Sequence, residues 1–280
     1  MTDTSQEDPV EKFTKRTKSQ LGYIPDIPDI RDFHYRPDET LMRQLPSSVD
    51  LTPAFPVYNQ GRIGSCTANA LAGAVQYERA AHDESPDFIP SRLFIYYNER
   101  VIEGSVDYDS GAMLRDGIKT LHKVGVCPEE RWPYDDTSSA HDGGAFPAEA
   151  PARKKPNAAC YQEASGYVIT HYERVHQDLT HLKTCLAGGT PFVFGFIVYD
   201  NWMNNTHPPA TQIPMPGKED KPVGGHAVLC VGYDDSTQLF RIRNSWGEDV
   251  GDRGYFFIPY DYLTRHQLAS DFWVIYAVRN

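Results

Sequence analysis

The chain lacks an excess of positive charge and any long run of apolar residues. Each absence argues against a class of binding partner or of protein. It carries 27 Lys and Arg against 38 Asp and Glu, a formal net charge of −11 at pH 7. Nucleic acids and anionic membranes are bound through basic side chains that neutralise phosphates, so we expect neither as a partner. No window approaches the run of about 18 apolar residues that a membrane-spanning helix needs.

Cysteine is also scarce. The five cysteines are odd in number and far apart, which is not the pattern of a disulfide framework. Residues Met1–Asp8 contain no apolar signal core. We therefore expect a cytoplasmic protein, or one exported by a route that needs no signal peptide. Because free cysteine behaves as a small apolar side chain, four of the five are predicted to be core residues, namely Cys127, Cys160, Cys185 and Cys230.

The fifth cysteine, Cys66, has the surroundings of a nucleophile. Gln60 precedes it by six positions, and Gly61 and Gly64 lie between them, where they allow the backbone to approach a substrate closely. The alanine-rich run after the cysteine predicts a helix that begins near it. A thiol at a helix N-terminus lies in positive potential, which favours the thiolate. The amide of Gln60 is placed to stabilise an oxyanion formed beside the sulfur.

Two further groups lie far downstream. His226 follows the pair Gly224-Gly225 and precedes an apolar run, and Asn244 opens the block Asn244-Ser-Trp-Gly247. A histidine within reach of a thiol can accept its proton, and an asparagine can hold the other ring nitrogen and fix the orientation of the ring. The three residues together indicate a Cys-His-Asn arrangement.

These blocks, in this order, resemble the papain family of cysteine proteases, whose signature places the cysteine after Gly-Ser or Gly-Ala with a later His and Asn. The resemblance covers roughly residues 47–275 and is closest to bacterial members without a long helical prosegment. It implies an α+β fold of two lobes, one helical and one β-barrel-like, with the active-site cleft between them. Ile63 and Thr67 depart from the pattern, since the family has a cysteine and an aromatic residue there.

The resemblance also implies roles for particular residues. Cys66, His226 and Asn244 would form the triad, Gln60 and the backbone N–H of Cys66 the oxyanion hole, and the indole of Trp246 a shield over the His-Asn contact. The segment Asp109–Met113 resembles the family's glycine pair that binds substrate backbone. Substrate contacts are therefore expected from Ser110, Gly111, Ala112, Met113, Gly225 and Trp246. Ala112 and Met113 would face a pocket for an apolar or aromatic side chain, unless Met113 only fills the core.

The implied activity is endopeptidase hydrolysis through a thioester acyl-enzyme, with His226 as general acid and then general base. Two alternatives stay open: a transferase or deamidase that uses the same Cys-His pair, and a catalytically silent scaffold that binds peptides in the same cleft. We expect peptide or protein substrates, a monomer and no cofactor. The other nine histidines show no metal-ligand spacing with the cysteines, so no zinc site is predicted.

The chain divides into four predicted regions: an N-terminal extension (1–44), a helical lobe (45–134), an exposed loop between the lobes (135–157) and a β-barrel-like lobe (158–280). Within the extension, Tyr23–Ile30 alternates apolar residues with Pro and Asp, which excludes a helix but leaves apolar surface for docking. Two placements are open for residues 20–44: across or beside the cleft, or on a lobe away from it. The proline-rich stretch 201–223 is predicted to overhang the cleft.

Periodicity and punctuation predict the main elements. Helices are expected from Cys66 to about His82, over Ser91–Asn98, Met113–Val124 and Leu179–Leu186. Strands are expected at Pro191–Tyr199, Ala227–Tyr233, Leu239–Arg243 and Tyr255–Ile258, and the resemblance to the family implies a further strand at Ser48–Leu51.

Overall fold

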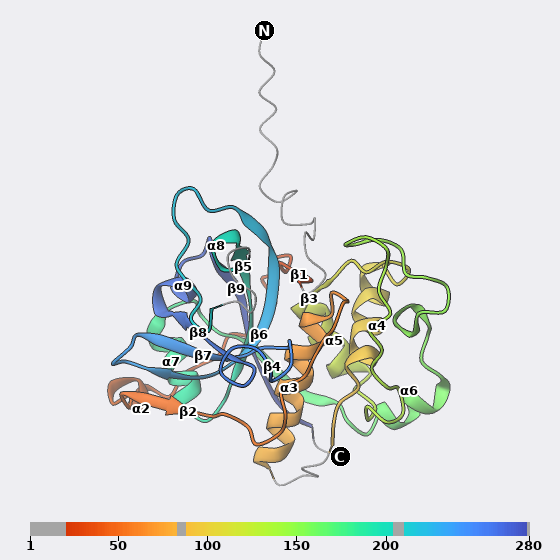
Figure 1. Cartoon of the computed structure of the whole chain (residues 1–280). Coiled ribbons are helices and arrows are strands. Elements are labelled where there is room, and N and C mark those ends of the chain that lie inside the picture. The colour runs from red at the N-terminus through yellow and green to blue at the C-terminus, as the bar shows by residue number, and fades with distance from the viewer. Residues whose placement is uncertain (1–20, 83–87, 204–209, 279–280) are drawn as a thin grey trace.

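A computed structural model of the protein describes residues 21–82, 88–203 and 210–278, so residues 1–20 of the predicted extension lie outside it. A sheet lobe and a helical lobe lie side by side, with helix α3 (Cys66–Ala81) between them (Figure 1). Helices are thus segregated from an antiparallel sheet, which is the α+β class that we predicted. Within the described residues, the helices are too short or too polar to cross a bilayer.

The helical lobe is built on α3, α4 (Arg92–Glu103) and α5 (Leu114–Lys123). Helix α4 begins where the Ser91 side chain accepts a hydrogen bond from the Phe94 N–H, and it ends at Gly104, whose φ of 69° is left-handed. An N-cap hydroxyl and a C-terminal glycine are the expected stop signals of a helix. The predicted helices are confirmed, although α4 runs five residues beyond the expected Asn98.

The sheet lobe holds a seven-stranded sheet in the order β4-β9-β5-β6-β7-β8, with β2 added onto β6. Every neighbouring pair is antiparallel. The strands are β2 (Ser48–Asp50), β4 (Ile169–Arg174), β5 (Phe192–Tyr199), β6 (Pro222–Asp234), β7 (Leu239–Arg243), β8 (Tyr255–Pro259) and β9 (Ala269–Val278). The short helices are α2 (Glu39–Arg43), α6 (Ala158–Ala164), α7 (Leu179–Ala187), α8 (Asp200–Met203), α9 (Tyr260–Thr264) and the 3-10 turn η1 (Pro151–Arg153).

Two hydrophobic clusters form the core. One surrounds α3 and the helical lobe, and the other lies on the sheet, where Phe192, Phe194 and Phe272 pack ring on ring. All five cysteines are buried and none is in a disulfide. The prediction that the four cysteines other than Cys66 are core residues is confirmed.

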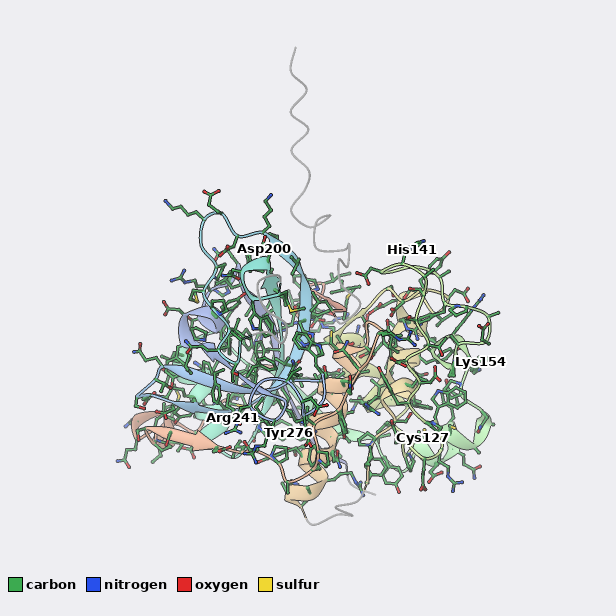
Figure 2. All side chains as sticks on the ribbon, in the orientation of Figure 1. Cys127, His141, Lys154, Asp200, Arg241 and Tyr276 are labelled. Atoms are coloured by element: carbon green, nitrogen blue, oxygen red, sulfur yellow. The ribbon has the colours of Figure 1, made fainter. Side chains whose placement is uncertain are left out.

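Residues 135–157, predicted as an exposed loop between the lobes, hold no regular element except the turn η1, and most of them are exposed or half-buried, but a few are anchored in the helical lobe. Phe146 and Ala152 are buried in the core of the helical lobe, and the Arg100 guanidinium donates to the Ala152 carbonyl at 2.5 Å. Figure 2 places His141 and Lys154 of this segment on the side of that lobe away from the sheet.

Helix α6 follows this segment and belongs with the helical lobe as well. The rings of Tyr161 on α6 and Phe94 on α4 lie 5.0 Å apart, and the Tyr161 hydroxyl donates to Asn98 at 3.0 Å. The sheet lobe therefore takes over only at β4, later than the boundary at residue 158 that composition indicated.

Residues 21–35, which we call the N-terminal strap, connect the two lobes. Strand β1 (Tyr23–Ile24) pairs in parallel with β3 (Ala112–Met113) of the helical lobe. The N–H of Gly22 donates to the carbonyl of Gly225 on β6 at 3.1 Å. The strap then leaves along the sheet edge, where the N–H of Tyr35 donates to the Arg174 carbonyl at 2.9 Å. Within residues 21–44, the start of the strap thus lies beside the strand that carries His226, whereas α2 packs on α7 of the sheet lobe.

Candidate active site

Cys66 is the first residue of α3, and this helix N-terminus has neither a capping side chain nor an acidic residue in its own first turn. The loop before the helix is held by Asp109, whose carboxylate accepts from the Gly64 N–H at 2.9 Å. The positive end of the helix dipole therefore acts directly on the sulfur, which favours a thiolate. Cys66 has 0% of its surface exposed in this arrangement.

Gln60 is buried and fixed on both sides of its amide. Its Oε1 accepts from the Ser245 hydroxyl at 2.7 Å, and its Nε2 donates to the Ile63 carbonyl at 3.0 Å. The amide nitrogen therefore points toward the loop that carries Cys66, with a second hydrogen still to donate. Ser245 lies inside the block Asn244–Gly247, but its role in holding the Gln60 amide was not predicted.

His226 on β6 is oriented by Asn244, which follows β7. The Nε2 of His226 lies 2.7 Å from the Oδ1 of Asn244. An amide oxygen only accepts, so Nε2 carries the proton and Nδ1 is left as the basic nitrogen. Among the described residues, Nδ1 has no hydrogen-bond partner. Burial lowers the pKa of His226 to about 4, while the bond to Asn244 opposes that shift.

An aromatic wall lies behind the imidazole. The ring of Trp246 stacks on that of His226 at 4.9 Å, and Trp202 of α8 stacks on Trp246 at 5.5 Å. Trp202 belongs to the stretch 201–223 that we predicted to overhang the cleft. Its indole packs behind the histidine, and residues 204–209 lie outside the described part of the chain. A tryptophan in a proline-rich segment gave no signal for this role.

One residue of the strap touches both sides of the site. A Cβ added to Gly22 would lie 1.9 Å from the Gly64 carbonyl oxygen, and the Gly22 N–H donates to Gly225. Gly64 is two residues before Cys66, and Gly225 is one residue before His226. The helix N-terminus and the histidine strand therefore approach the same point from opposite lobes.

The expected substrate-binding segment contacts the strap through its backbone. The Ala112 N–H donates to the Gly22 carbonyl at 2.8 Å, and a Cβ on Gly111, whose φ is 76°, would lie 2.1 Å from the same oxygen. Ser110 instead donates its hydroxyl to Ser105 at 3.0 Å. Ala112 is buried and Met113 is half-buried in β3.

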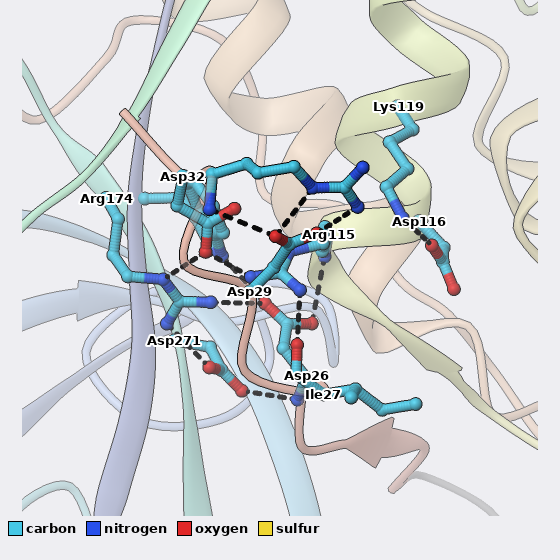
Figure 3. Close-up of polar contacts among 11 residues, drawn as sticks. Asp26, Ile27, Asp29, Asp32, Arg115, Asp116, Lys119, Arg174 and Asp271 are labelled. Atoms are coloured by element: carbon cyan, nitrogen blue, oxygen red, sulfur yellow. Dashed lines mark hydrogen bonds and ion pairs between the residues drawn. The ribbon is translucent and has the colours of Figure 1, made fainter. Parts of the chain in front are cut away.

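A buried ionic network anchors the strap next to this site (Figure 3). The Asp26 carboxylate accepts from the Arg115 backbone N–H at 3.0 Å and from the Trp273 indole at 2.9 Å. Arg174 pairs with Asp26 at 3.3 Å and with Asp271 at 2.9 Å. Burial, followed by the charge of Asp271, raises the pKa of Asp26 to about 7. The network joins α5 of one lobe to β4 and β9 of the other.

No cluster of three or more His, Cys, Asp or Glu side chains suited to a metal ion is found among residues 21–82, 88–203 and 210–278.

Known proteins share this architecture. A model of the papain family cysteine proteases matches residues 45–272. Xylellain, a cysteine protease from Xylella fastidiosa, is 62% identical, and its crystal structure has a TM-score of 0.92 over 95% of this chain and 98% of that one. A peptidase C1-like protein of Acanthamoeba polyphaga mimivirus is 36% identical over 290 residues, which are 95% of this chain and 89% of that protein.

A more distant structure, procathepsin B S9 from Trypanosoma congolense, is 18% identical and has a TM-score of 0.67 over 91% of this chain, which shows the shared two-lobe fold. The predicted fold and the resemblance to bacterial members agree with these matches. The chain belongs to the papain family of cysteine proteases, hydrolases that act on peptide or protein substrates.

Proposed function

We propose that the protein is an endopeptidase in which Cys66 is the nucleophile, His226 the proton carrier, Asn244 its positioning partner and Gln60 an oxyanion donor. The observation that carries this proposal is the 2.7 Å contact between His226 Nε2 and Asn244 Oδ1. It leaves Nδ1 as the one basic nitrogen of the ring. The start of α3 at Cys66 supports the same assignment, because it favours the thiolate.

In the first step the thiol proton passes to His226 Nδ1 and the sulfur attacks the peptide carbonyl carbon. The oxyanion is held by the Cys66 N–H and the free N–H of Gln60 Nε2. The C–N bond then breaks, and Nδ1 returns its proton to the leaving amine. In the second step water gives a proton to Nδ1 and attacks the thioester carbonyl carbon. The C–S bond then breaks, which releases the acid, and Nδ1 returns its proton to the sulfur to restore the thiol.

We propose in addition that the strap covers this site in the resting protein. Gly22 contacts the backbone beside both Cys66 and His226, and both side chains have 0% exposure. A substrate has to displace residues 21–24 before it reaches the sulfur.

The test compares Cys66→Ala with the matched variant Cys185→Ala, in which another buried cysteine is removed from the sheet lobe. We expect Cys66→Ala to abolish cleavage of a peptide library and Cys185→Ala to retain it. Gln60→Ala should lose on the order of 10²–10³ in kcat. Products are identified by mass spectrometry, since free acids indicate hydrolysis and amine adducts a transferase. Peptide binding without cleavage, or full activity in Cys66→Ala, would reject the proposal.

A further inference from the structure

The backbone of Gln60 is hydrogen-bonded on both sides, and one of the bonds comes from a residue that the mechanism above does not use. On the side of the sheet lobe, the Gln60 N–H donates to the Ser245 carbonyl at 2.8 Å. On the side of the helical lobe, the Tyr134 hydroxyl donates to the Gln60 carbonyl at 2.9 Å. Tyr134 therefore holds a proposed oxyanion donor from outside the loop that carries it.

The same hydroxyl reaches the residue before the nucleophile. The Oη of Tyr134 lies 2.5 Å from the Oγ of Ser65, which is fully buried. Ser65 directly precedes α3, and its side chain makes no capping bond to the helix, so its hydroxyl is available to Tyr134. One phenolic oxygen thus links the backbone of Gln60 to the residue before Cys66. The two groups proposed to hold the oxyanion lie at the two ends of this link.

The direction of each bond follows from groups that can only donate or only accept. A carbonyl oxygen only accepts, so Tyr134 gives its one proton to Gln60 and takes the proton of the Ser65 hydroxyl. The Ser65 oxygen in turn accepts from the Asn69 Nδ2 at 3.0 Å. Burial raises the pKa of the Tyr134 phenol, so the phenol keeps its proton at neutral pH. The chain of bonds therefore runs in one direction, from the Asn69 amide to the Gln60 carbonyl.

Arg92, the first residue of α4, fixes the far end of this chain. A guanidinium only donates, and its Nη1 lies 3.4 Å from the Asn69 Oδ1, which turns the amide nitrogen of Asn69 toward the start of α3. The same Nη1 donates to the Asn59 carbonyl at 3.2 Å. The guanidinium carbon also lies 4.0 Å from the centroid of the Tyr134 ring. Since Glu129 pairs with Arg92 at 2.5 Å, the cluster acts on the site through geometry rather than through net charge.

We propose that Tyr134 is a positioning residue of the oxyanion hole, and that its hydroxyl sets the separation between Gln60 and the start of α3 at Cys66. The inference rests on the proposed peptidase function, because it concerns the oxyanion formed there. Without the hydroxyl, the buried Gln60 carbonyl would lose its donor, and we expect the loop to shift toward another one. A small shift matters, because oxyanion donors act at about 2.7–3.1 Å.

The first test compares Tyr134→Phe with the matched control Tyr161→Phe. Each change deletes one hydroxyl from a half-buried tyrosine of the helical lobe, and that of Tyr161 donates to Asn98 away from the site. We expect Tyr134→Phe to lower kcat for a cleaved fluorogenic peptide by about ten- to hundredfold at an unchanged KM, less than the loss of a donor itself. Tyr161→Phe should leave both constants unchanged. Thermal unfolding of both variants verifies that they fold.

A second variant, Ser65→Ala, removes the other half of the link. It should lower kcat in the same direction, so the inference can still be rejected if Tyr134→Phe does not fold. An unchanged kcat in folded Ser65→Ala would then overturn it.

A double-mutant cycle distinguishes positioning from a merely structural role. If Tyr134 acts through the Gln60 amide, Tyr134→Phe should lower kcat by less than about threefold once Gln60→Ala has removed that amide. A structural role would instead give losses that multiply.

A peptide aldehyde examines the oxyanion hole without turnover. The Cys66 sulfur bonds to the aldehyde carbon, the thiol proton passes to the carbonyl oxygen, and nothing is released. Because the adduct places an oxygen where the oxyanion would form, its affinity should fall in Tyr134→Phe by about the factor seen in kcat. Alkylation of Cys66 by iodoacetamide forms no oxyanion, so its rate should stay the same.

The outcomes separate this inference from the proposed function. Aldehyde binding that weakens in Tyr134→Phe, with no cleavage of any peptide by the wild type, supports the positioning role and counts against the peptidase. Cleavage with the same kcat in Tyr134→Phe and Tyr161→Phe, or with losses that multiply in the cycle, retains the peptidase and rejects the positioning role. A wild type that neither cleaves peptides nor binds the aldehyde rejects both.

Discussion

At the residue scale, two buried titratable groups respond to pH in opposite senses. The pKa of His226 is lowered from 6.5 to about 4, so its protonation favours a state in which the ring is exposed. The pKa of Asp26 is raised from 3.8 to about 7. Between pH 3.8 and about 7, Asp26 therefore keeps a proton with the strap docked that it would lose in water. Docking is consequently favoured at low pH and weakens as the pH rises through this range.

This predicts a pH dependence that Asp26→Asn removes. As the pH rises from about 4 to 7, docking of the wild-type strap should weaken relative to that of Asp26→Asn, because only the wild type must bury a charge there. The ratio of wild-type to variant rates of Cys66 alkylation should therefore rise, by at most about tenfold per pH unit. Site-specific mass spectrometry measures both rates. The ionisation of Cys66 and His226 cancels in the ratio, so a flat ratio would contradict the assignment.

At the scale of elements, the strap depends on a close approach that only glycine permits. Its backbone lies against Gly64 and Gly111 in loops and against Gly225 on β6, and a Cβ on Gly22 would lie 1.9 Å from a backbone oxygen. Backbone atoms cannot swing aside as a flexible side chain can. The tight contact at Gly22 and the ionic network at Asp26 therefore hold the strap at separate points.

Gly22→Ala is expected to release the first part of the strap without changing a group that takes part in the chemistry. Peptide cleavage and Cys66 alkylation should both rise, by about five- to 150-fold, since a clash of this kind costs about 1–3 kcal/mol. Ile30→Ala is the matched control, because Ile30 lies in the same strap and is fully exposed. If both variants behave as the wild type, the strap does not limit access to the site.

At the scale of the whole molecule, no disulfide links the two lobes. Helix α3 packs on β6 and β9, and the strap network joins α5 to β4 and β9. None of the five cysteines is in a disulfide, and Ile63 stands where the family has a cysteine. Packing and buried ion pairs therefore supply the stability between the lobes.

The thermal midpoint should accordingly be the same with and without a reducing agent, within about 1 °C. A native disulfide typically contributes about 2–4 kcal/mol, which would shift the midpoint of a chain of this size by several degrees. Differential scanning calorimetry in both buffers measures the shift. A fall of several degrees on reduction would reveal a disulfide that the structure lacks.

Much of this architecture is local in the sequence. Several helix and strand ends follow from propensity and capping. The local signals are the alanine-rich run after Cys66, the hydroxyl of Ser91 and the glycines around His226. The family blocks identify the same residues. By contrast, the small residues of 135–157 suggest a linker. The burial of part of this segment on a distant helix leaves no periodic signal in the sequence, so composition does not reveal it.

The sequence alone determined the class of protein, the order of the lobes and the residues proposed for the chemistry, because these depend on short blocks and on residue type. Only the tertiary structure decided where the strap runs, which nitrogen of His226 is basic, and how the Tyr134 hydroxyl meets Gln60 and Ser65 across a sequence separation of 74 and 69 residues. Those contacts depend on strand register and burial, and such properties exist only once distant segments are packed together.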